Sequence, residues 1–137
     1  MSFLLDTNAC IALINGKPAT VRGNFDAAIK RRTSVFVSSI VQFELWYGVA
    51  KSANRERNTA RLSAFFAGPV EVVPFDSKDA QRSGLVRAEL EMVGRPIGPY
   101  DLLISGQALR HKMTLVTANH REFARVKGLQ WVDWARE

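Results

Sequence analysis

Short apolar runs alternate with longer amphipathic stretches along this chain, and the alternation predicts strands separated by helices. The apolar runs predict strands at 3–5, 34–39, 70–75, 114–119 and, more briefly, 129–134. The periodic stretches predict helices at about 7–15, 18–32, 40–52, 54–66, 77–93 and from Pro99 onward. Strands joined by helical stretches pair in parallel, so we expect an α/β protein: a three-layer α/β/α sandwich with a central parallel sheet of four to five strands.

Length and composition favour one soluble unit. The 137 residues, 47% of them hydrophobic, can bury a core without disulfides, and no repeat or linker divides them, so we expect a single domain over 1–137. Cys10 is the only cysteine, which predicts a buried thiol and a reducing, cytoplasmic location. We expect no signal peptide and no membrane partner, because no apolar run reaches the roughly 20 residues of a membrane helix.

Three acidic residues interrupt apolar surroundings, where a charge needs a partner or a metal ion. Asp6 follows FLL, Glu44 lies inside IVQFELWYG, and Asp101 lies between GPY and LLI. Taken singly, each acid has a simpler explanation: Asp6 as a helix cap, Asp101 as an acid favoured at a helix start, and Glu44 as the partner of a basic residue. The carboxyl ends of parallel strands meet at one edge of a sheet, however, which would gather Asp6, Asp101 and the loop of Asn119, with Glu44 on a helix beside them.

Such a cluster of carboxylates predicts a metal site, because repelling charges need a cation. Oxygen ligands, with one cysteine and two histidines in the whole chain, favour Mg²⁺ or Mn²⁺ over Zn²⁺. The net charge of +6 and the sequence pI of about 10.0 point to an anionic partner. A magnesium site on a basic protein suggests phosphodiester chemistry.

Four blocks of sequence carry a resemblance to a known family. DTN, SSIVQFELWYG, GRPIGPYDLLISGQAL and TLVTANHREFARVKGLQWVDW, in this order from Phe3 to Trp134, resemble the PIN-domain ribonucleases, specifically the VapC toxins of type II toxin-antitoxin modules. The resemblance implies a PIN-like fold and a Mg²⁺- or Mn²⁺-dependent endoribonuclease that inhibits translation. Water activated by the metal would attack an RNA phosphate in line, leaving a 5′-phosphate and a 3′-hydroxyl. Likeness to relatives suggests tRNA, including initiator tRNA, as the substrate.

The resemblance also assigns roles to individual residues. Asp6, Glu44 and Asp101 match metal-binding and catalytic acids, and Asn119 falls at a fourth acidic position, where the loss of one charge leaves a second metal in question. Its amide oxygen could still ligate metal or hold a water. Supporting roles fall on Thr7 and Asn8, which would orient Asp6 and the bound water, on the Thr117 hydroxyl, and on Glu122, which either compensates for Asn119 or is a cap or surface residue. Candidates for holding the RNA backbone are Lys30, Arg31, Arg32, Arg55, Arg57, Arg61 and Arg95.

Partners are implied as well. VapC proteins are typically homodimers, and a VapB antitoxin inserts a C-terminal segment that blocks the acidic site; the resulting hetero-oligomer binds operator DNA through the antitoxin. The aromatic residues Phe43, Trp46 and Tyr47, together with Phe65 and Phe66, either pack in the core or form an exposed patch for another subunit.

Other functions are less consistent with the sequence. An aspartyl-nucleophile phosphatase requires a second Asp two positions after the first, where this chain has Asn8, and no phosphate-binding glycine loop occurs. His111 and His120 are not needed as proton carriers beside a metal-activated water. Asn119 keeps one alternative open, a catalytically weak PIN-type module that binds RNA or regulates.

Overall fold

The computed structural model describes residues 1–136 and contains one five-stranded parallel sheet with the order β3-β2-β1-β4-β5. This confirms the expected α/β class and parallel pairing. The strands are β1 (Ser2–Leu5), β2 (Ser34–Ser38), β3 (Glu71–Val73), β4 (Thr114–Val116) and β5 (Trp131–Val132).

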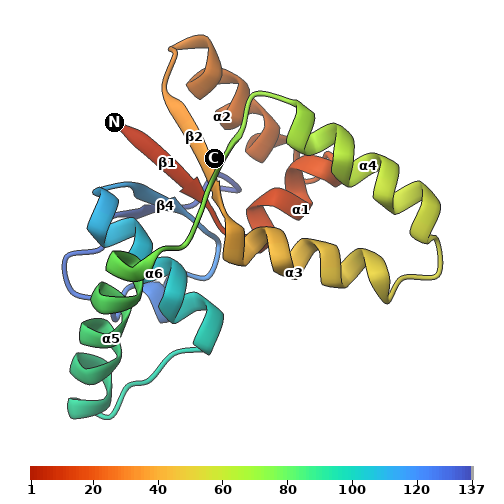
Figure 1. Ribbon diagram of the computed structural model, residues 1–137. Coiled ribbons are helices and arrows are strands. Elements are labelled where there is room, and N and C mark those ends of the chain that lie inside the picture. Colours follow the sequence, from red (N-terminus) through yellow and green to blue (C-terminus); the bar gives the residue numbers. More distant parts are fainter. Residues whose placement is uncertain (137) are drawn as a thin grey trace.

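Helices cover both faces of the sheet, with α1, α2 and α4 on one side and α5 and α6 on the other (Figure 1). They are α1 (Thr7–Asn15), α2 (Ala19–Lys30), α3 (Ser39–Ala50), α4 (Arg55–Ala67), α5 (Ser77–Met92), α6 (Pro99–His111) and the short α7 (His120–Phe123). The sequence patterns predicted all of these except α7, which is too short to show a period. Among the described residues, no helix is long and apolar enough to cross a membrane.

The central strands are buried on both faces, which explains their continuous apolar sequences. Leu4, Leu5, Val37, Leu115 and Val116 are all at most 1% exposed. Cys10 is fully buried, as predicted. The buried strands therefore give a fixed support to the residues that follow them in the chain.

Local chemistry explains where the helices beside the strand ends begin. Asp6 caps α1 by accepting a hydrogen bond from the Ala9 N–H at 2.8 Å, and Ser38 caps α3 through the Ile40 N–H at 3.1 Å. Pro99 occupies the first turn of α6, where its missing N–H has no helical partner to lose. The helices α1 and α3 thus start directly after β1 and β2, whereas α6 follows the loop after α5.

The helices α5 and α6 pack against each other at a glycine. A Cβ atom placed on Gly106 would lie 2.7 Å from the Ser83 Cα atom, closer than packed atoms can approach. The Ser83 hydroxyl in turn donates to the Asp79 carbonyl oxygen at 2.8 Å. This close contact holds α6 in place against α5, and Asp101 lies in the first turn of α6.

Candidate active site

The strand register brings polar residues together at one edge of the sheet. Leu5 pairs with Val37 and with Val116, and Val116 pairs with Val132, so four strands reach this edge at the same level. The residues that come next in the chain are Asp6, Ser38, Thr117 and Asp133. The edge expected from strand-end topology is therefore present, although β4 ends at Val116, three residues before Asn119.

Asp6 is 5% exposed, and its carboxylate accepts a hydrogen bond from the Ala9 N–H at 2.8 Å. The Thr117 hydroxyl lies beside the same carboxylate. Burial raises the pKa of Asp6, the Thr117 hydroxyl and the Ala9 N–H lower it, and the charges of Glu44 and Asp133 raise it further. Asp6 is thus both a helix cap and a member of the acidic cluster, so the two interpretations open at the level of sequence are compatible.

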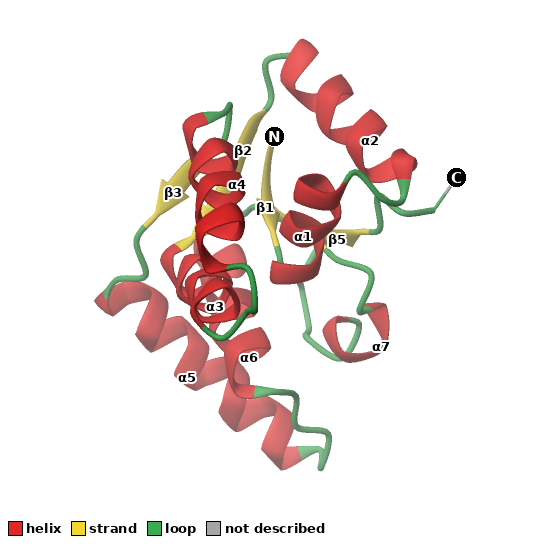
Figure 2. Ribbon diagram, turned by 90° about the vertical axis from the view of Figure 1, so that its right-hand side faces the viewer, coloured by secondary structure: helices red, strands yellow, loops and turns green. Residues whose placement is uncertain are grey.

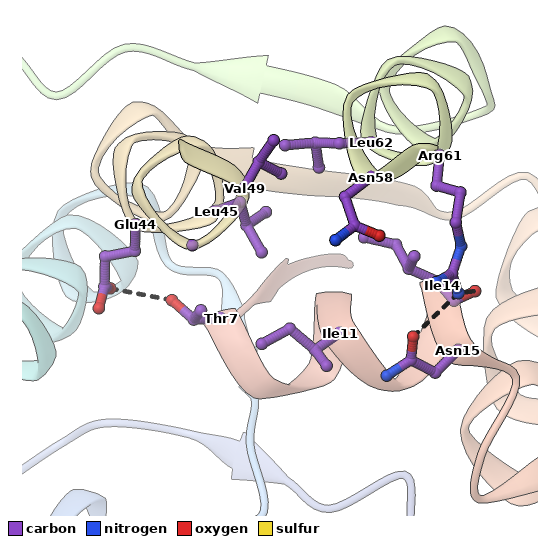
Figure 3. Close-up of a pocket in the computed structure, with 11 residues that line it drawn as sticks. Thr7, Ile11, Ile14, Asn15, Glu44, Leu45, Val49, Asn58, Arg61 and Leu62 are labelled. Atoms are coloured by element: carbon purple, nitrogen blue, oxygen red, sulfur yellow. Dashed lines mark hydrogen bonds between the residues drawn. The ribbon is translucent and has the colours of Figure 1, made fainter. Parts of the chain in front are cut away.

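Glu44 projects from α3 toward the start of α1. The Thr7 hydroxyl donates to its carboxylate at 2.9 Å (Figure 3). Thr7 therefore positions Glu44, whereas the resemblance suggested that it orients Asp6. Asn8 is exposed, and within residues 1–136 the structure shows no hydrogen bond from its side chain to Asp6, so its expected orienting role is not seen.

Asp101, in the first turn of α6, lies against Asn119 and Glu122. The Asn119 amide nitrogen donates to Glu122 Oε2 at 2.8 Å and to Asp101 Oδ2 at 3.3 Å. Asn119 was expected to offer its amide oxygen to a metal; here its amide nitrogen faces the carboxylates instead. Its backbone N–H donates to the Thr117 hydroxyl at 2.9 Å, which links this loop to Asp6.

The carboxyl group of Asp101 has a strongly perturbed pKa, raised to about 7. Burial is the largest cause, followed by a hydrogen bond and charge repulsion with Glu122, and then by the charges of Asp6 and Glu44. The pKa of Glu122 is lowered, first by the hydrogen bond with Asp101 and then by those from Asn119 and the Gly98 N–H, against an opposing effect of burial. A proton on Asp101 can therefore be donated to Glu122.

Glu122 belongs to the cluster by its geometry. Its Oε1 accepts from the Gly98 N–H at 3.2 Å and its Oε2 from Asn119, so both oxygens are fixed beside Asp101. Of the two interpretations open for this residue, surface exposure and compensation for Asn119, the position favours the second. Glu122 thus supplies a negative charge three residues after Asn119, the position at which the resemblance predicts a fourth acid.

In the described part of the chain, none of the carboxylates of Asp6, Glu44, Asp101 and Glu122 forms an ion pair, although the charge of Arg125 helps to lower the pKa of Glu122. Within residues 1–136, every ion pair shorter than 4.0 Å involves other acids, namely Asp26, Asp76, Asp79, Glu91 and Asp133. The charges of neighbouring acids help to raise the pKa of Asp6 and of Asp101, and a bound cation would relieve that repulsion.

The donor set fits a Mg²⁺ ion that is held partly through its own water ligands. In the described part of the chain, no three Asp, Glu, His or Cys side chains are close enough to hold one ion together. Mg²⁺ commonly keeps several waters and takes only one or two carboxylates directly, so a separated set of oxygen donors suits it, whereas Zn²⁺ would need a closed set of three or four ligands.

Asp133 is a member of this edge that the sequence analysis missed. It follows β5 directly, and its charge contributes to the raised pKa of Asp6. Its side chain is 10% exposed and accepts from the Ala135 N–H at 2.9 Å. The same strand-end rule that singled out Asp6 would have found it.

The basic candidates divide into two groups. Arg61 contacts the rest of the fold, because its Nη2 donates to the Ile14 carbonyl at 3.0 Å and to Asn15 Oδ1 at 2.9 Å (Figure 3). It therefore holds α4 against the end of α1. The remaining candidates are exposed: Lys30, Arg31, Arg32, Arg55, Arg57 and Arg95.

A cavity of about 370 Å³ extends from the acidic site between α1, α3 and α4 (Figure 3). Thr7 and Glu44 line one end and Arg61 the other, with apolar side chains such as Ile11 and Leu45 between them. On the outer surface of α3, Phe43 and Tyr47 are 54% and 58% exposed and Trp46 is 37% exposed. Phe65 and Phe66 pack against the core instead.

Known proteins share this sequence and this architecture. The profile of the PIN domain matches residues 3–129. The tRNA(fMet)-specific endonuclease VapC of Shigella flexneri is 42% identical over 135 residues, covering 98% of this chain and 99% of that protein. The structure of VapBC2 from Rickettsia felis bound to a promoter DNA fragment has a TM-score of 0.91 at 38% identity, covering 98% of this chain and 99% of that one. DNA-bound VapBC from Salmonella typhimurium has a TM-score of 0.89 at 41% identity, covering 98% of both chains.

These similarities extend over nearly the whole chain and agree with an acidic strand-end site of the kind that PIN-domain nucleases use with divalent metal ions. The chain therefore belongs to the PIN-domain family, as an endoribonuclease toxin of the VapC type.

Proposed function

We propose that this chain, as one PIN domain over 1–137, uses Mg²⁺ to cleave tRNA, initiator tRNA(fMet) included, and so stops translation in the cytoplasm. The observation that carries the metal requirement is the set of four carboxylates at the strand-end edge, none of which forms an ion pair within residues 1–136. The substrate is supported by two relatives, 42% and 41% identical, that are named as tRNA(fMet)-specific endonucleases.

The acids have distinct tasks in this proposal. Asp6, Glu44 and Asp101 hold Mg²⁺, directly or through its waters, and Glu122 supplies a further charge. A bound Mg²⁺ supplies neutralisation of the scissile phosphate and activation of water. Mn²⁺ also suits oxygen donors and is expected to substitute.

Three neighbouring side chains keep these acids in place before RNA binds. The Thr117 hydroxyl fixes Asp6, the Thr7 hydroxyl fixes Glu44, and the Asn119 amide fixes Asp101 and Glu122. Ligands that are already oriented lose less entropy when the reacting groups assemble. The exposed basic residues Arg31, Arg32, Arg55, Arg57 and Arg95 supply salt-dependent attraction for the RNA backbone.

The partners follow from two surfaces. A segment of a VapB-type antitoxin fits the cavity between α1, α3 and α4, because its walls are largely apolar and one end opens at Glu44, where a basic side chain would neutralise the acids. The exposed aromatic side chains of α3 form a homodimer face, where Phe43 and Tyr100 lie 5.9 Å apart between ring centroids. Operator DNA would be bound through the antitoxin, as relatives' VapBC complexes are DNA-bound.

The test is cleavage of total tRNA by antitoxin-free protein with Mg²⁺ or with EDTA. Asp6→Asn and Asp101→Asn are expected to lower the rate at least 100-fold, whereas the control Asp26→Asn changes an exposed carboxylate paired with Arg22 and leaves the rate unchanged. Cleavage that continues in EDTA, or in either site variant, would overturn the proposal.

One observation favours a second candidate, a PIN module that binds RNA without turnover. No three carboxylates of the described residues converge on one ion, so metal affinity depends on water-mediated ligation. Wild-type protein that binds tRNA but cleaves nothing with Mg²⁺ or Mn²⁺ would support this second function.

A further inference from the structure

Two aromatic rings stack on each other at the β5 side of the sheet, beside the acidic site. The ring of His120, the first residue of α7, and the ring of Trp131, the first residue of β5, lie 5.6 Å apart between centroids at 19°. Trp131 is partly buried and also packs against the core. The position of α7 next to β5 is visible in Figure 2.

Positive charge surrounds this ring pair. Arg136 Nη2 lies 3.5 Å from His120 Nε2, and the Arg136 side chain is 68% exposed. The acid nearest to that guanidinium, Asp133, is 3.8 Å away, too far for a hydrogen bond. Arg121 is exposed and directly follows His120.

Both rings are attached to residues of the acidic site. His120 follows Asn119, whose amide donates to Asp101 and Glu122. Trp131 lies two residues before Asp133, and the charge of Asp133 helps to raise the pKa of Asp6. His120 also shares the short helix α7 with Glu122, so the ring pair and the acidic site belong to the same two elements, α7 and β5, and the loops that flank them.

We propose that His120 and Trp131 form a stacking platform for one unpaired RNA base next to the scissile phosphate, with Arg121 and Arg136 holding the adjoining phosphates. The platform rests on the proposed ribonuclease function and narrows its substrate class to RNA with an unpaired segment at the cut. The base extends the stack on the His120 side, because the core covers Trp131.

General chemistry supports this occupant. Bases in a duplex are stacked on their neighbours, whereas an unpaired base offers both faces to aromatic or guanidinium planes. Ring pairs flanked by arginine suit that ligand, because the rings take the base and the cations take the phosphates. His120 then acts by stacking and needs no proton transfer.

The test uses a single-stranded RNA decamer that carries 2-aminopurine, whose fluorescence falls when it stacks, titrated with full-length Asp6→Asn protein so that the RNA stays intact. We expect saturable quenching at one or more positions of the base. Adding His120→Ala should weaken binding about tenfold and remove the quenching, and Trp131→Leu should do the same. His120→Phe should restore both, which a purely structural role of the imidazole would not explain.

A matched pair of arginine variants tests the phosphate contacts. Arg136→Ala and Arg87→Ala each remove an arginine that is paired with an acid and is 68% or 69% exposed. Arg136→Ala should lower the slope of log Kd against log salt by about one, and Arg87→Ala should leave it unchanged.

The outcomes separate this proposal from the ribonuclease proposal. Unchanged affinity and quenching in folded His120→Ala and Trp131→Leu protein would overturn the platform, even if wild-type protein cleaves tRNA. Quenching that depends on both rings would support it, even if the wild type cleaves nothing. Variants that alter only the oligomeric state would show a protein interface here and would also overturn the platform.

Discussion

The unpaired carboxylates predict that removing one charge stabilises the metal-free protein while it destroys activity. Asp101→Asn keeps the shape of the side chain, can still accept from Asn119 and can donate to Glu122. It removes the carboxyl group whose pKa is raised to about 7. In EDTA, the variant should therefore unfold at a higher temperature than the wild type.

The sign and size follow from the pKa. Because the folded protein holds the Asp101 proton more tightly than the unfolded chain does, the wild type loses stability as the pH rises from the unfolded value of 3.8 through about 7. A rise from 3.8 to about 7 would correspond to about 4 kcal/mol for a fully buried carboxyl group. Asp101 is only half-buried and water screens its charge, so we expect about 1 to 2 kcal/mol, or roughly 3 to 6 °C.

The assay is thermal unfolding of wild type and variant in EDTA at pH 5 and pH 8, with Asp26→Asn as the control. The gap between Asp101→Asn and wild type should be small at pH 5 and large at pH 8, since all other titrating groups are shared. Mg²⁺ at pH 8 should stabilise the wild type more than the variant, because it binds the folded site. An equal gap at the two pH values would refute the reasoning that repulsion at Asp101 destabilises the metal-free fold.

Three further changes test parts of the site and its support. Thr117→Val removes the hydroxyl beside the Asp6 carboxylate and should lower kcat about 10- to 100-fold, whereas Thr117→Ser should keep most of it; single-turnover cleavage measures both. Arg61→Ala should lower the free energy of unfolding by about 1 to 3 kcal/mol in urea and leave the salt dependence of RNA binding unchanged, because its guanidinium is used inside the fold. Gly106→Ala should cost about 3 kcal/mol or more by collision with α5, while Gly84→Ala, with open space at its Cβ, should gain about 0.5 to 1 kcal/mol in the same urea titrations.

The sequence was sufficient for the architecture and for the gathering of the acids. Apolar runs and periodic stretches located every strand, because buried parallel strands read as continuous apolar segments. Strand-end topology placed Asp6 and Asp101 at one edge with Glu44 on a helix beside them, and the structure decides that Glu122, left open by the sequence, lies against Asp101. The same strand-end rule, applied to β5, predicts that Asp133 lies at this edge as well.

The sequence could not predict which side chains form hydrogen bonds with one another. Thr7 donates to Glu44 across 37 positions in the chain, and no local pattern specifies such a bond. The direction of the Asn119 amide depends on Glu122 and Asp101 both lying on one side of it. Arg61 reads as a surface cation in its helix, yet its long side chain reaches the end of α1, which only the packing of α4 on α1 decides.

The double use of Asp6, as the cap of α1 and as a site acid, has a consequence for inheritance. Asparagine caps a helix about as well as aspartate does, so Asp6→Asn removes the charge and keeps the start of α1. The codons for the two residues differ at one nucleotide. Under the role proposed for Asp6, a lineage can therefore lose the activity of this gene in a single mutational step, carry a well-folded inactive copy for many generations, and recover the activity by the reverse step.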